Sequence, residues 1–255
     1  MFLVTGGTGT LGQHVVPLLR EAGGDVRVLT RQARSPGQLA GDLETGQGLD
    51  EALDGVDTVL HLAGSPKNDE QKAQFLVRAA ARAKKPHIVY VSVVGCERIP
   101  VRSGIDRAMF GYFQQKRAAE IVIEKSGLPW TTLRATQFHD LTLKVATAAA
   151  RLPVMPAFSG VRFQPVETAE VARRLVDLAM GEPAGIQPDF AGPRVYPMAE
   201  LFRIWLRATG RRRAVISVRP FGGAYKAVRG GAVLPGRDAD LGTVTWEDFL
   251  KVRAG

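Results

Sequence analysis

The chain has 255 residues and a formal net charge of +9, with 45% hydrophobic and 23% charged residues. This composition is typical of a globular α/β protein and excludes a disordered chain. No apolar run is long enough for a membrane span, and an apolar strand starting at Met1 leaves no space for a signal peptide. We therefore expect a cytoplasmic protein without a membrane partner, in which the single cysteine, Cys96, is a buried filler.

The positive charge raises the question of nucleic-acid binding. Its densest cluster, Arg211-Arg212-Arg213, follows Thr209-Gly210, a pattern typical of a helix end, where cations offset the helix dipole. No nucleic-acid-binding motif accompanies this cluster, so we expect no nucleic-acid partner. The four histidines share no ligand spacing, and we expect no metal site.

The first predicted element is an apolar strand, Phe2–Thr5, that leads into glycines spaced three residues apart. A helical pattern over 11–21 follows them. Such a strand–turn–helix unit binds phosphate because backbone N–H groups converge at the positive end of the helix. Gly6 permits the tight turn, Gly9 lets a pyrophosphate approach, and Gly12 lets the helix pack on the strand. The predicted cofactor contacts in this turn are Gly6, Thr8, Gly9, Thr10, Leu11 and Gly12.

The elements that follow alternate in the rhythm of βαβ units. Further strands are predicted over 26–30, 58–62, 88–94 and 131–133, and helices over 49–53, 72–83 and 109–125. Continuous apolar runs such as Ile88–Val91 are typical of parallel strands covered on both faces. After Arg134, helical patterns over 140–152, 169–180, 198–208 and 246–253 are separated by loops rich in proline and glycine.

This order of elements predicts an α/β fold, a Rossmann-type doubly wound parallel sheet with a small C-terminal substrate lobe. The predicted domains are a dinucleotide-binding core over 1–138 and a lobe over 139–255, from which one segment, about 161–180, returns to the core. Residues 162–166 are expected to cross back into the main sheet. Ligands of open α/β sheets bind in a crevice at the carboxyl ends of the strands, where we expect the lobe to lie.

The second predicted strand ends in Thr30-Arg31, where an NAD-binding protein would place an acidic residue. A guanidinium group suits the 2′-phosphate of NADP(H), so we predict this cofactor, with Arg31 and Arg34 as contacts. The alternative is that both arginines are solvated loop residues. Loops that could reach the adenine follow the next two strand positions, at Asp42, Leu43, Ala63 and Gly64.

Tyr112 and Lys116 lie four residues apart in the predicted helix over 109–125 and therefore share one face. A free tyrosine has a pKa of about 10 and is a poor base at neutral pH. A neighbouring ammonium group and the positive ring of an oxidised nicotinamide favour the phenolate. Such a phenol can donate or accept a proton beside a hydride transfer.

Together these features resemble the short-chain dehydrogenase/reductase superfamily, most closely its atypical, NmrA-like NAD(P)H-binding branch. The resemblance covers residues 1 to about 180 and rests on the glycine motif, Thr30-Arg31, Gly41-Asp42-Leu43, Leu62-Ala63-Gly64, Tyr112 with Lys116, and Leu133–Phe138. It implies a nicotinamide cofactor and a Ser/Thr–Tyr–Lys set, with Tyr112 as proton donor and Lys116 binding the ribose. It also implies that the nicotinamide end is lined by Thr136, Gln137 and Phe138.

The hydroxyl member of this set belongs at the carboxyl end of the predicted strand over 88–94, where the sequence offers Ser92. Many catalytic members carry two or three hydroxyl residues in a row there, and the useful one is often the last. Val93-Val94 follow Ser92, so either Ser92 fills the role or water or another donor replaces it. His139 and Asp140 could point into the substrate pocket, and Asp140 could equally cap a helix. His61, in a strand interior, is predicted to be a hydrogen-bonded core histidine.

We therefore expect an NADPH-dependent oxidoreductase acting on a small carbonyl or quinone-like compound. Two alternatives stay open, a cofactor-retaining epimerase or isomerase and a non-catalytic NADP(H)-sensing regulatory protein. An intact pair of Tyr112 and Lys116 favours an enzyme, because a pure sensor has little use for it. The sequence specifies neither the substrate nor the oligomeric state.

Overall fold

A computed structural model describes residues 1–65 and 67–254 of the chain. The chain divides into two compact units. The first unit contains residues 1–92, 111–134 and 169–187, and the second contains 93–110, 135–168 and 188–255. The domain boundaries predicted from the sequence stay a prediction.

The first unit is built on a sheet with the strand order β3-β2-β1-β4-β5-β6. Parallel pairing joins β1 to β2 and β4, β2 to β3, and β4 to β5. This order reverses its direction between β1 and β4, which is the point where dinucleotides bind in doubly wound sheets. The strands are β1 (Phe2–Thr5), β2 (Val26–Thr30), β3 (Gln38–Ala40), β4 (Thr58–His61), β5 (His87–Val93) and β6 (Trp130–Ala135), and β9 (Gly185–Ile186) pairs with β6.

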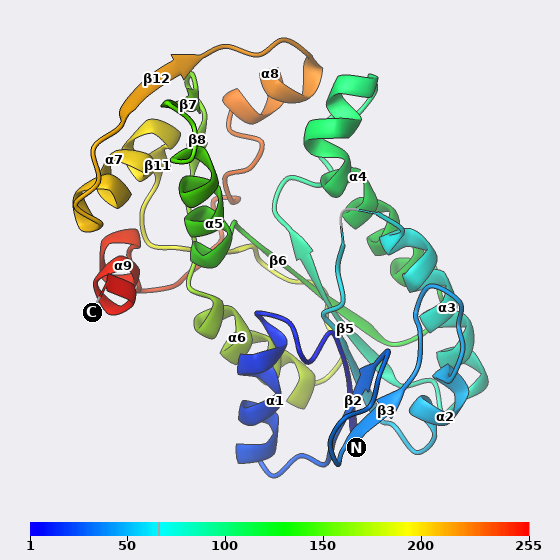
Figure 1. Cartoon of the computed structure of the whole chain (residues 1–255). Helices are drawn as coiled ribbons and strands as arrows, with labels where there is room; N and C mark the ends of the chain where they lie inside the picture. The colour runs from blue at the N-terminus through cyan, green and yellow to red at the C-terminus, as the bar shows by residue number, and fades with distance from the viewer. Residues whose placement is uncertain (66, 255) are drawn as a thin grey trace. The chain divides into compact units, whose positions relative to one another are not determined.

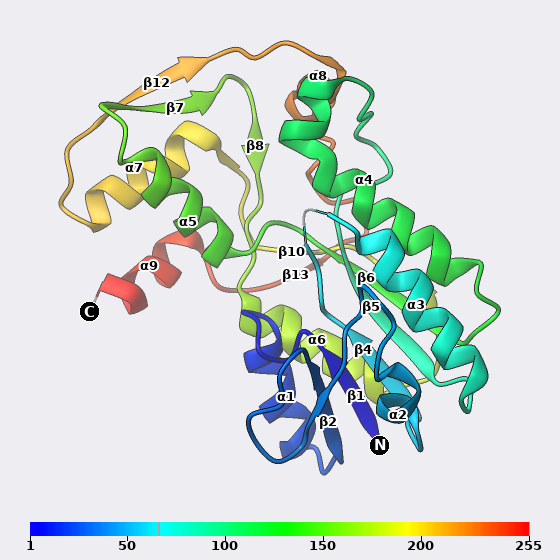
Figure 2. The ribbon, with the colours of Figure 1, turned by 45° about the vertical axis from the view of Figure 1, so that its right-hand side comes forward.

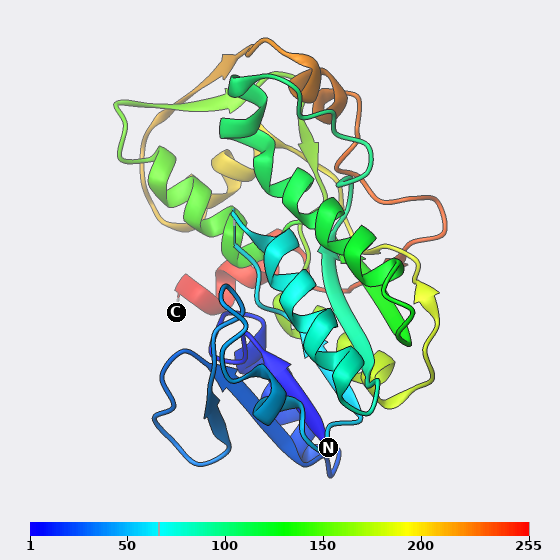
Figure 3. The same cartoon turned by 90° about the vertical axis from the view of Figure 1, so that its right-hand side faces the viewer.

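Helices cover both faces of this sheet, as Figure 1 shows, with α1 and α6 on one face and α2, α3 and the C-terminal half of α4 on the other. Figure 3 shows α3 and that half of α4 alongside each other. The bounds are α1 (Gly12–Glu21), α2 (Leu49–Leu53), α3 (Asp69–Arg82), α4 (Gly104–Glu124) and α6 (Thr168–Met180). Because both faces are covered, the central strands are buried on both sides, and Leu3, Val59 and Ile88 are completely buried. The predicted doubly wound α/β fold is confirmed.

The second unit packs helices on two small sheets. Parallel strands β7 (Val154–Phe158) and β12 (Ala214–Val218) run side by side in Figure 2. Met155 and Ala157 turn inward from β7 onto a core that contains Phe202, Trp205 and Trp246. The remaining elements are β8 (Arg162–Phe163), β10 (Phe190–Ala191), β11 (Tyr196–Pro197), β13 (Asp240–Leu241), α5 (His139–Ala149), α7 (Met198–Ala208), α8 (Gly223–Arg229) and α9 (Trp246–Ala254).

Two expectations are corrected by these elements. Residues 162–166 do not add a strand to the main sheet: Arg162-Phe163 form β8 and pair antiparallel with β11, and Val166 makes a single parallel bridge with Phe138 beyond the end of β6. Helix α4 begins at Gly104, five residues before the predicted start at 109. The Ser103 hydroxyl accepts the Asp106 N–H at 3.0 Å, and the Asp106 carboxylate accepts the Ser103 N–H at 3.1 Å, which is a reciprocal cap.

No helix in the described part of the chain has the length and apolar character that a membrane crossing requires. Cys96 is buried, as expected of a filler.

Candidate cofactor and catalytic site

The glycine turn joins β1 to α1 and lies against the loop that follows β4. Gly6 has a φ of +71°, and a Cβ atom there would stand 2.7 Å from the backbone nitrogen of Ala63. A Cβ atom on Gly12 would stand 2.3 Å from the Gly6 carbonyl oxygen, so α1 begins in direct contact with the turn. At Gly9 the nearest atom to an added Cβ is the Gly6 oxygen at 3.3 Å. Gly6 and Gly12 are thus required for the turn itself, whereas Gly9 leaves space that a ligand can approach.

The turn also offers backbone donors at the N-terminus of α1. The Gly9 N–H donates to the Gly6 carbonyl oxygen at 3.0 Å, whereas the N–H groups of Thr10 and Leu11 find no acceptor among residues 1–65 and 67–254. Thr8, Gly9 and Thr10 are exposed. Free N–H groups at the positive end of a helix are the donors that a phosphate needs. The residues of this turn therefore fit the pyrophosphate of a dinucleotide.

The two arginines predicted to contact a 2′-phosphate lie in the exposed segment after β2. Thr5 pairs with Leu29, so the glycine turn and Thr30-Arg31 leave neighbouring strands at the same edge of the sheet. In the described structure the Arg31 guanidinium group makes no hydrogen bond or ion pair, and Arg34 donates to Gln32 Oε1 at 3.0 Å. Arg31 therefore carries an uncompensated charge beside the turn.

The four residues predicted near the adenine occupy two loops. The Asp42 carboxylate accepts the Glu44 N–H at 2.8 Å and so closes its own turn. The Leu43 side chain is buried in the core rather than exposed on the loop. The Ala63 N–H donates to the Thr5 hydroxyl at 3.3 Å, which fixes the loop after β4 against β1.

Tyr112 and Lys116 lie on one face of α4, with the Lys116 Nζ atom 5.7 Å from the centre of the Tyr112 ring. Tyr112 is 36% exposed, whereas Lys116 is 3% exposed. The Lys116 ammonium donates to the Val91 carbonyl oxygen at 3.2 Å and lies 4.9 Å from the centre of the Tyr90 ring. A buried cation thus stands next to a phenol that solvent and substrate can reach.

The charge of Lys116 depends on its neighbours. Burial lowers the pKa of the Lys116 amine, and attraction to Tyr90, Tyr112 and Asp69 raises it, with a net increase above the usual value. Asp69 lies nearest among the acids, with its Oδ2 atom 3.5 Å from Lys116 Nζ. At neutral pH the lysine is therefore an ammonium ion, which is the form that donates to a ribose hydroxyl.

The Ser92 hydroxyl, which a catalytic role would direct at substrate, bonds instead to a carboxylate within the protein. This carboxylate belongs to Glu120. Glu120 is fully buried and accepts two hydrogen bonds of 2.8 Å from Arg134 and one of 2.8 Å from Arg117. These partners hold the pKa of Glu120 below its usual value although burial would raise it. Ser92 is thus part of a buried ionic network, and its predicted contact with substrate stays a prediction.

Thr136, Gln137 and Phe138 follow β6 and belong to the second unit. The Thr136 hydroxyl donates to the Gln164 carbonyl oxygen at 2.6 Å, and Phe138 precedes the first residue of α5. Both polar atoms of the Gln137 carboxamide are buried and have no hydrogen-bond partner in the described structure. Because an unpaired buried amide is unfavourable, this group is suited to a polar ligand.

The remaining candidates have structural roles. His61 is 1% exposed and its Nδ1 atom lies 2.8 Å from the Thr5 hydroxyl, so the predicted core histidine is confirmed. His139 stacks on Trp246 and Phe249. Asp140 does not cap α5, because the helix begins one residue earlier. Its carboxylate instead accepts the Thr168 hydroxyl at 2.8 Å and an Arg253 N–H at 2.9 Å.

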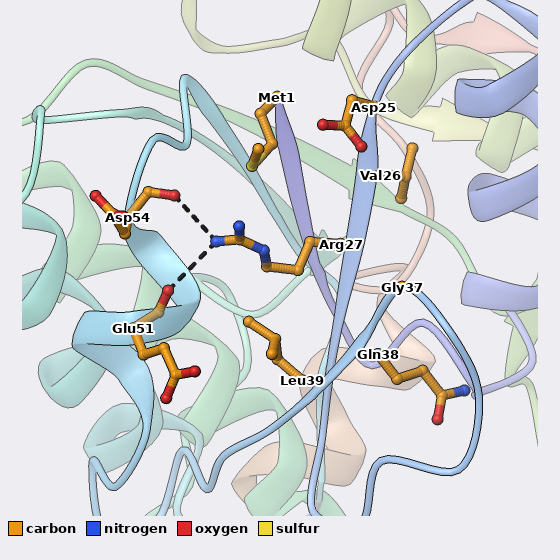
Figure 4. A pocket seen from close by; sticks show the side chains of 9 residues that line it. All are labelled: Met1, Asp25, Val26, Arg27, Gly37, Gln38, Leu39, Glu51 and Asp54. Carbon is orange, nitrogen blue, oxygen red and sulfur yellow. Dashed lines mark hydrogen bonds between the residues drawn. The ribbon is translucent and has the colours of Figure 1, made fainter.

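A pocket in the first unit lies at the opposite, amino edge of the strands (Figure 4). Arg27 points across it and donates to the carbonyl oxygens of Ala52 and Asp54 at 2.9 and 3.0 Å, which caps the end of α2. This pocket is not part of the candidate site. Within the described residues, no three His, Cys, Asp or Glu side chains gather closely enough to hold a metal ion.

A family model described as NAD(P)H-binding matches residues 6–180. The chain belongs to this NAD(P)H-binding family. The match begins at the first glycine of the turn, ends with α6, and includes both Tyr112 and Lys116. The nicotinamide cofactor predicted from the glycine turn is therefore confirmed at the level of NAD(P)H.

Two curated relatives of this NAD(P)H-binding protein are named as reductases. The (4-alkanoyl-5-oxo-2,5-dihydrofuran-3-yl)methyl phosphate reductase of Streptomyces griseus is 32% identical over 167 residues, which are 63% of this chain and 56% of the relative. The NAD(P)H azoreductase of Xenophilus azovorans is 33% identical over 157 residues, 58% of this chain and 52% of the relative. The chain thus spans little more than half the length of these relatives.

Among solved structures, the NADPH-dependent quinone oxidoreductase of Escherichia coli in complex with NADPH is similar over 100% of both chains, with a TM-score of 0.80 and 17% identity. The Citrobacter triphenylmethane reductase in complex with NADP(H) is similar over 98% of this chain and 99% of its own, with a TM-score of 0.76 and 19% identity. At these identities the likeness shows the fold.

Proposed function

We propose that this protein is an NADPH-dependent reductase of the short-chain dehydrogenase/reductase superfamily, in its NmrA-like branch. The observation that carries the proposal is a solvent-accessible tyrosine, Tyr112, next to a buried ammonium group, Lys116, in a member of the NAD(P)H-binding family. When bound, the cofactor supplies a hydride. The reductase names of the curated relatives support the reaction class, and a small carbonyl or quinone-like compound is the proposed substrate.

Residues of the chain bind the cofactor and transfer the proton. The N–H groups of the glycine turn hold the pyrophosphate, and the Arg31 guanidinium group holds the 2′-phosphate. Lys116 donates to a ribose hydroxyl, and the Tyr112 hydroxyl transfers its proton to the substrate oxygen. One hydride on carbon and one proton on oxygen complete a two-electron reduction of a carbonyl group.

The test of this proposal is NADPH oxidation by the full chain against a panel of aldehydes, ketones and quinones. We expect at least one compound to increase the oxidation rate above that measured without substrate, and NADH to support a lower rate. Failure of the protein to bind NADPH in a calorimetric titration would overturn the proposal.

One observation favours a second candidate, a non-catalytic NADP(H) sensor. Ser92 is engaged with Glu120, so the usual hydroxyl partner of the tyrosine is occupied. A sensor would bind NADPH and NADP⁺ with different affinities and would turn over no member of the panel. Turnover of any member at a rate that depends on Tyr112 rules this candidate out.

A further inference from the structure

A buried carboxylate next to Lys116 has no role in the mechanism above. Asp69 is the first residue of α3 and is 1% exposed. Its Oδ2 atom lies 3.5 Å from the Nζ atom of Lys116 and makes no hydrogen bond in the described structure. Neither member of this ion pair reaches solvent, and Asp69 is the only carboxylate paired with Lys116 among residues 1–65 and 67–254, so the charge of the lysine depends on it for compensation.

The other oxygen of Asp69 is fixed by the loop that follows β4. The Oδ1 atom accepts the Ser65 N–H at 2.8 Å and the Ser65 hydroxyl at 3.3 Å. Lys72, one turn along α3, donates to the same hydroxyl at 2.6 Å and lies 3.7 Å from Oδ1. These contacts orient the carboxylate so that Oδ2 is left for Lys116.

Gly64 leaves the space that this ion pair occupies. A Cβ atom at that position would stand 2.9 Å from the Lys116 Nζ atom and 3.5 Å from the Asp69 Oδ2 atom. Any larger residue would push the ammonium group away from the carboxylate. The loop predicted to contact the cofactor is thus built around the ion pair.

Asp69 is the one negative charge that faces Lys116 at neutral pH in the part of the chain that the structure describes. Burial raises the pKa of Tyr90 on β5 and keeps its phenol neutral. Tyr112 on α4 presents the face of its ring to the ammonium group. His61 on β4 is kept uncharged by burial, which lowers its pKa to about 3. Lys72 on α3 carries the same sign as Lys116. Without Asp69, only the Val91 carbonyl oxygen and the two tyrosines would oppose the effect of burial, which favours the neutral amine.

We propose that Asp69 is a positioning residue that holds Lys116 in its ammonium form, beside Tyr112 and the loop at Gly64. This inference rests on the proposed role of Lys116 and adds the residue that maintains it. The Asp69 carboxylate touches neither substrate nor cofactor in this account, and it acts through the lysine.

The first experiment follows Lys116 directly in the protein without cofactor. Protein labelled with ¹³C at the lysine Cε atoms is titrated between neutral and alkaline pH, and the Lys116 signal is assigned by its loss in Lys116→Met. In the wild type this signal should not titrate over the range in which the fold is stable. In Asp69→Asn the same signal should titrate within that range, because burial favours the neutral amine and the nearest opposite charge is gone.

The matched control is Glu70→Gln, which removes the same charge from the next residue of the same helix turn. Glu70 is exposed, and within residues 1–65 and 67–254 its carboxylate accepts one hydrogen bond, from Gln74. We expect this variant to titrate like the wild type, and Asp69→Glu to restore part of the effect. A Lys116 titration in Asp69→Asn that overlies the wild-type one overturns the proposal.

The second experiment measures NADPH binding by calorimetry across the same pH range. The affinity of Asp69→Asn should decrease with rising pH earlier than that of the wild type, by about one pH unit or more. If wild type and variant both fail to bind NADPH, the proposed function fails, while the titration of Lys116 still decides the role of Asp69.

If Asp69→Asn is too unstable for the titration, a double-mutant cycle measures the interaction of Asp69 with Lys116 through protein stability. Stability is measured for Asp69→Asn, Lys116→Met and the double variant. Asp69 keeps its contacts with Ser65 and Lys72 in the Lys116→Met background, so the loss caused by Asp69→Asn should be smaller there, by the coupling energy of the Asp69–Lys116 pair, but not absent. An equal loss in both backgrounds would show that Asp69 does not act through the lysine.

Discussion

The Glu120 carboxylate and the Arg134 guanidinium group form two parallel hydrogen bonds of 2.8 Å in the interior of the first unit. They join α4 to β6, and Glu120 is fully buried. The same helix carries Tyr112 and Lys116, so this pair fixes the helix that presents the proposed proton donor. Ser92 and Arg117 complete the hydrogen bonding of the carboxylate.

Glu120→Gln should lower the free energy of unfolding by about 3–5 kcal/mol, because it removes the buried carboxylate to which Arg134 donates two hydrogen bonds, whereas Arg117 keeps Glu124. Glu124→Gln is the control, since Glu124 bonds to Arg117 at a partly exposed position and should cost about 1 kcal/mol or less. Urea unfolding of the three proteins measures both changes. Equal losses in the two variants would contradict the assigned role of Glu120.

The stability of the protein should decrease in mild acid because of His61. Burial and the nearby charges of Lys116 and Lys72 lower the pKa of His61 to about 3 from 6.5. Between these values the unfolded chain binds a proton that the folded chain does not. The stabilisation is therefore fully present above pH 6.5 and decreases by about 1.4 kcal/mol per pH unit below it.

Urea unfolding at several pH values between 7.5 and about 5 checks this slope. His61→Gln removes the titrating ring and should flatten the dependence. His87 also has a pKa lowered by burial, so part of the slope remains in the variant. A variant with the full wild-type slope would show that His61 is not responsible.

Much of the fold follows from the sequence, and the reason differs between elements. β1, β2 and α2 have the predicted bounds, because each is a short, largely apolar segment bounded by glycine or charged residues. β3 and β7 were not predicted. β3 has three residues and none is fully buried, whereas β7 contains Pro156, a residue that argues against a strand. The start of α4 was missed because its signal is the Ser103–Asp106 cap rather than an apolar repeat.

The residues of the candidate site also differ in whether the sequence alone reveals them. The glycine turn and the pair of Tyr112 and Lys116 are local in sequence, so spacing alone reveals them. Asp69 lies 47 positions before Lys116, and no local pattern connects two residues that meet only when α3 packs beside α4. Gly7 was also missed, although a Cβ atom there would stand 2.7 Å from the Val28 side chain. Partners of this kind become visible only with the fold.

Arg31→Ala should remove most of the preference for NADPH over NADH. A charge-assisted hydrogen bond to the 2′-phosphate contributes roughly 1.5–3 kcal/mol, which is about a tenfold to hundredfold preference. Arg20→Ala is the control, because Arg20 lies at the far end of α1 from the glycine turn. Calorimetric titration gives all the affinities, and equal binding of NADPH and NADH by the wild type would refute the role of Arg31.

Gly9→Val should abolish NADPH binding while the fold is retained. The added side chain would fill the open side of the turn, where the pyrophosphate is expected. Gly104→Val is the matched control, since no atom lies within 4 Å of an added Cβ there. Circular dichroism reports the fold and calorimetry the binding. Normal NADPH affinity in a folded Gly9→Val protein would place the phosphate site elsewhere.

Proton donation by Tyr112 is tested by comparing Tyr112→Phe with the wild type on whichever substrate of the panel is turned over. The variant keeps the ring and loses the transferable proton, so NADPH affinity should change little. General acid catalysis contributes about a hundredfold to ten-thousandfold, and turnover should decrease by that factor. Hydride transfer that continues undiminished in Tyr112→Phe would contradict the account.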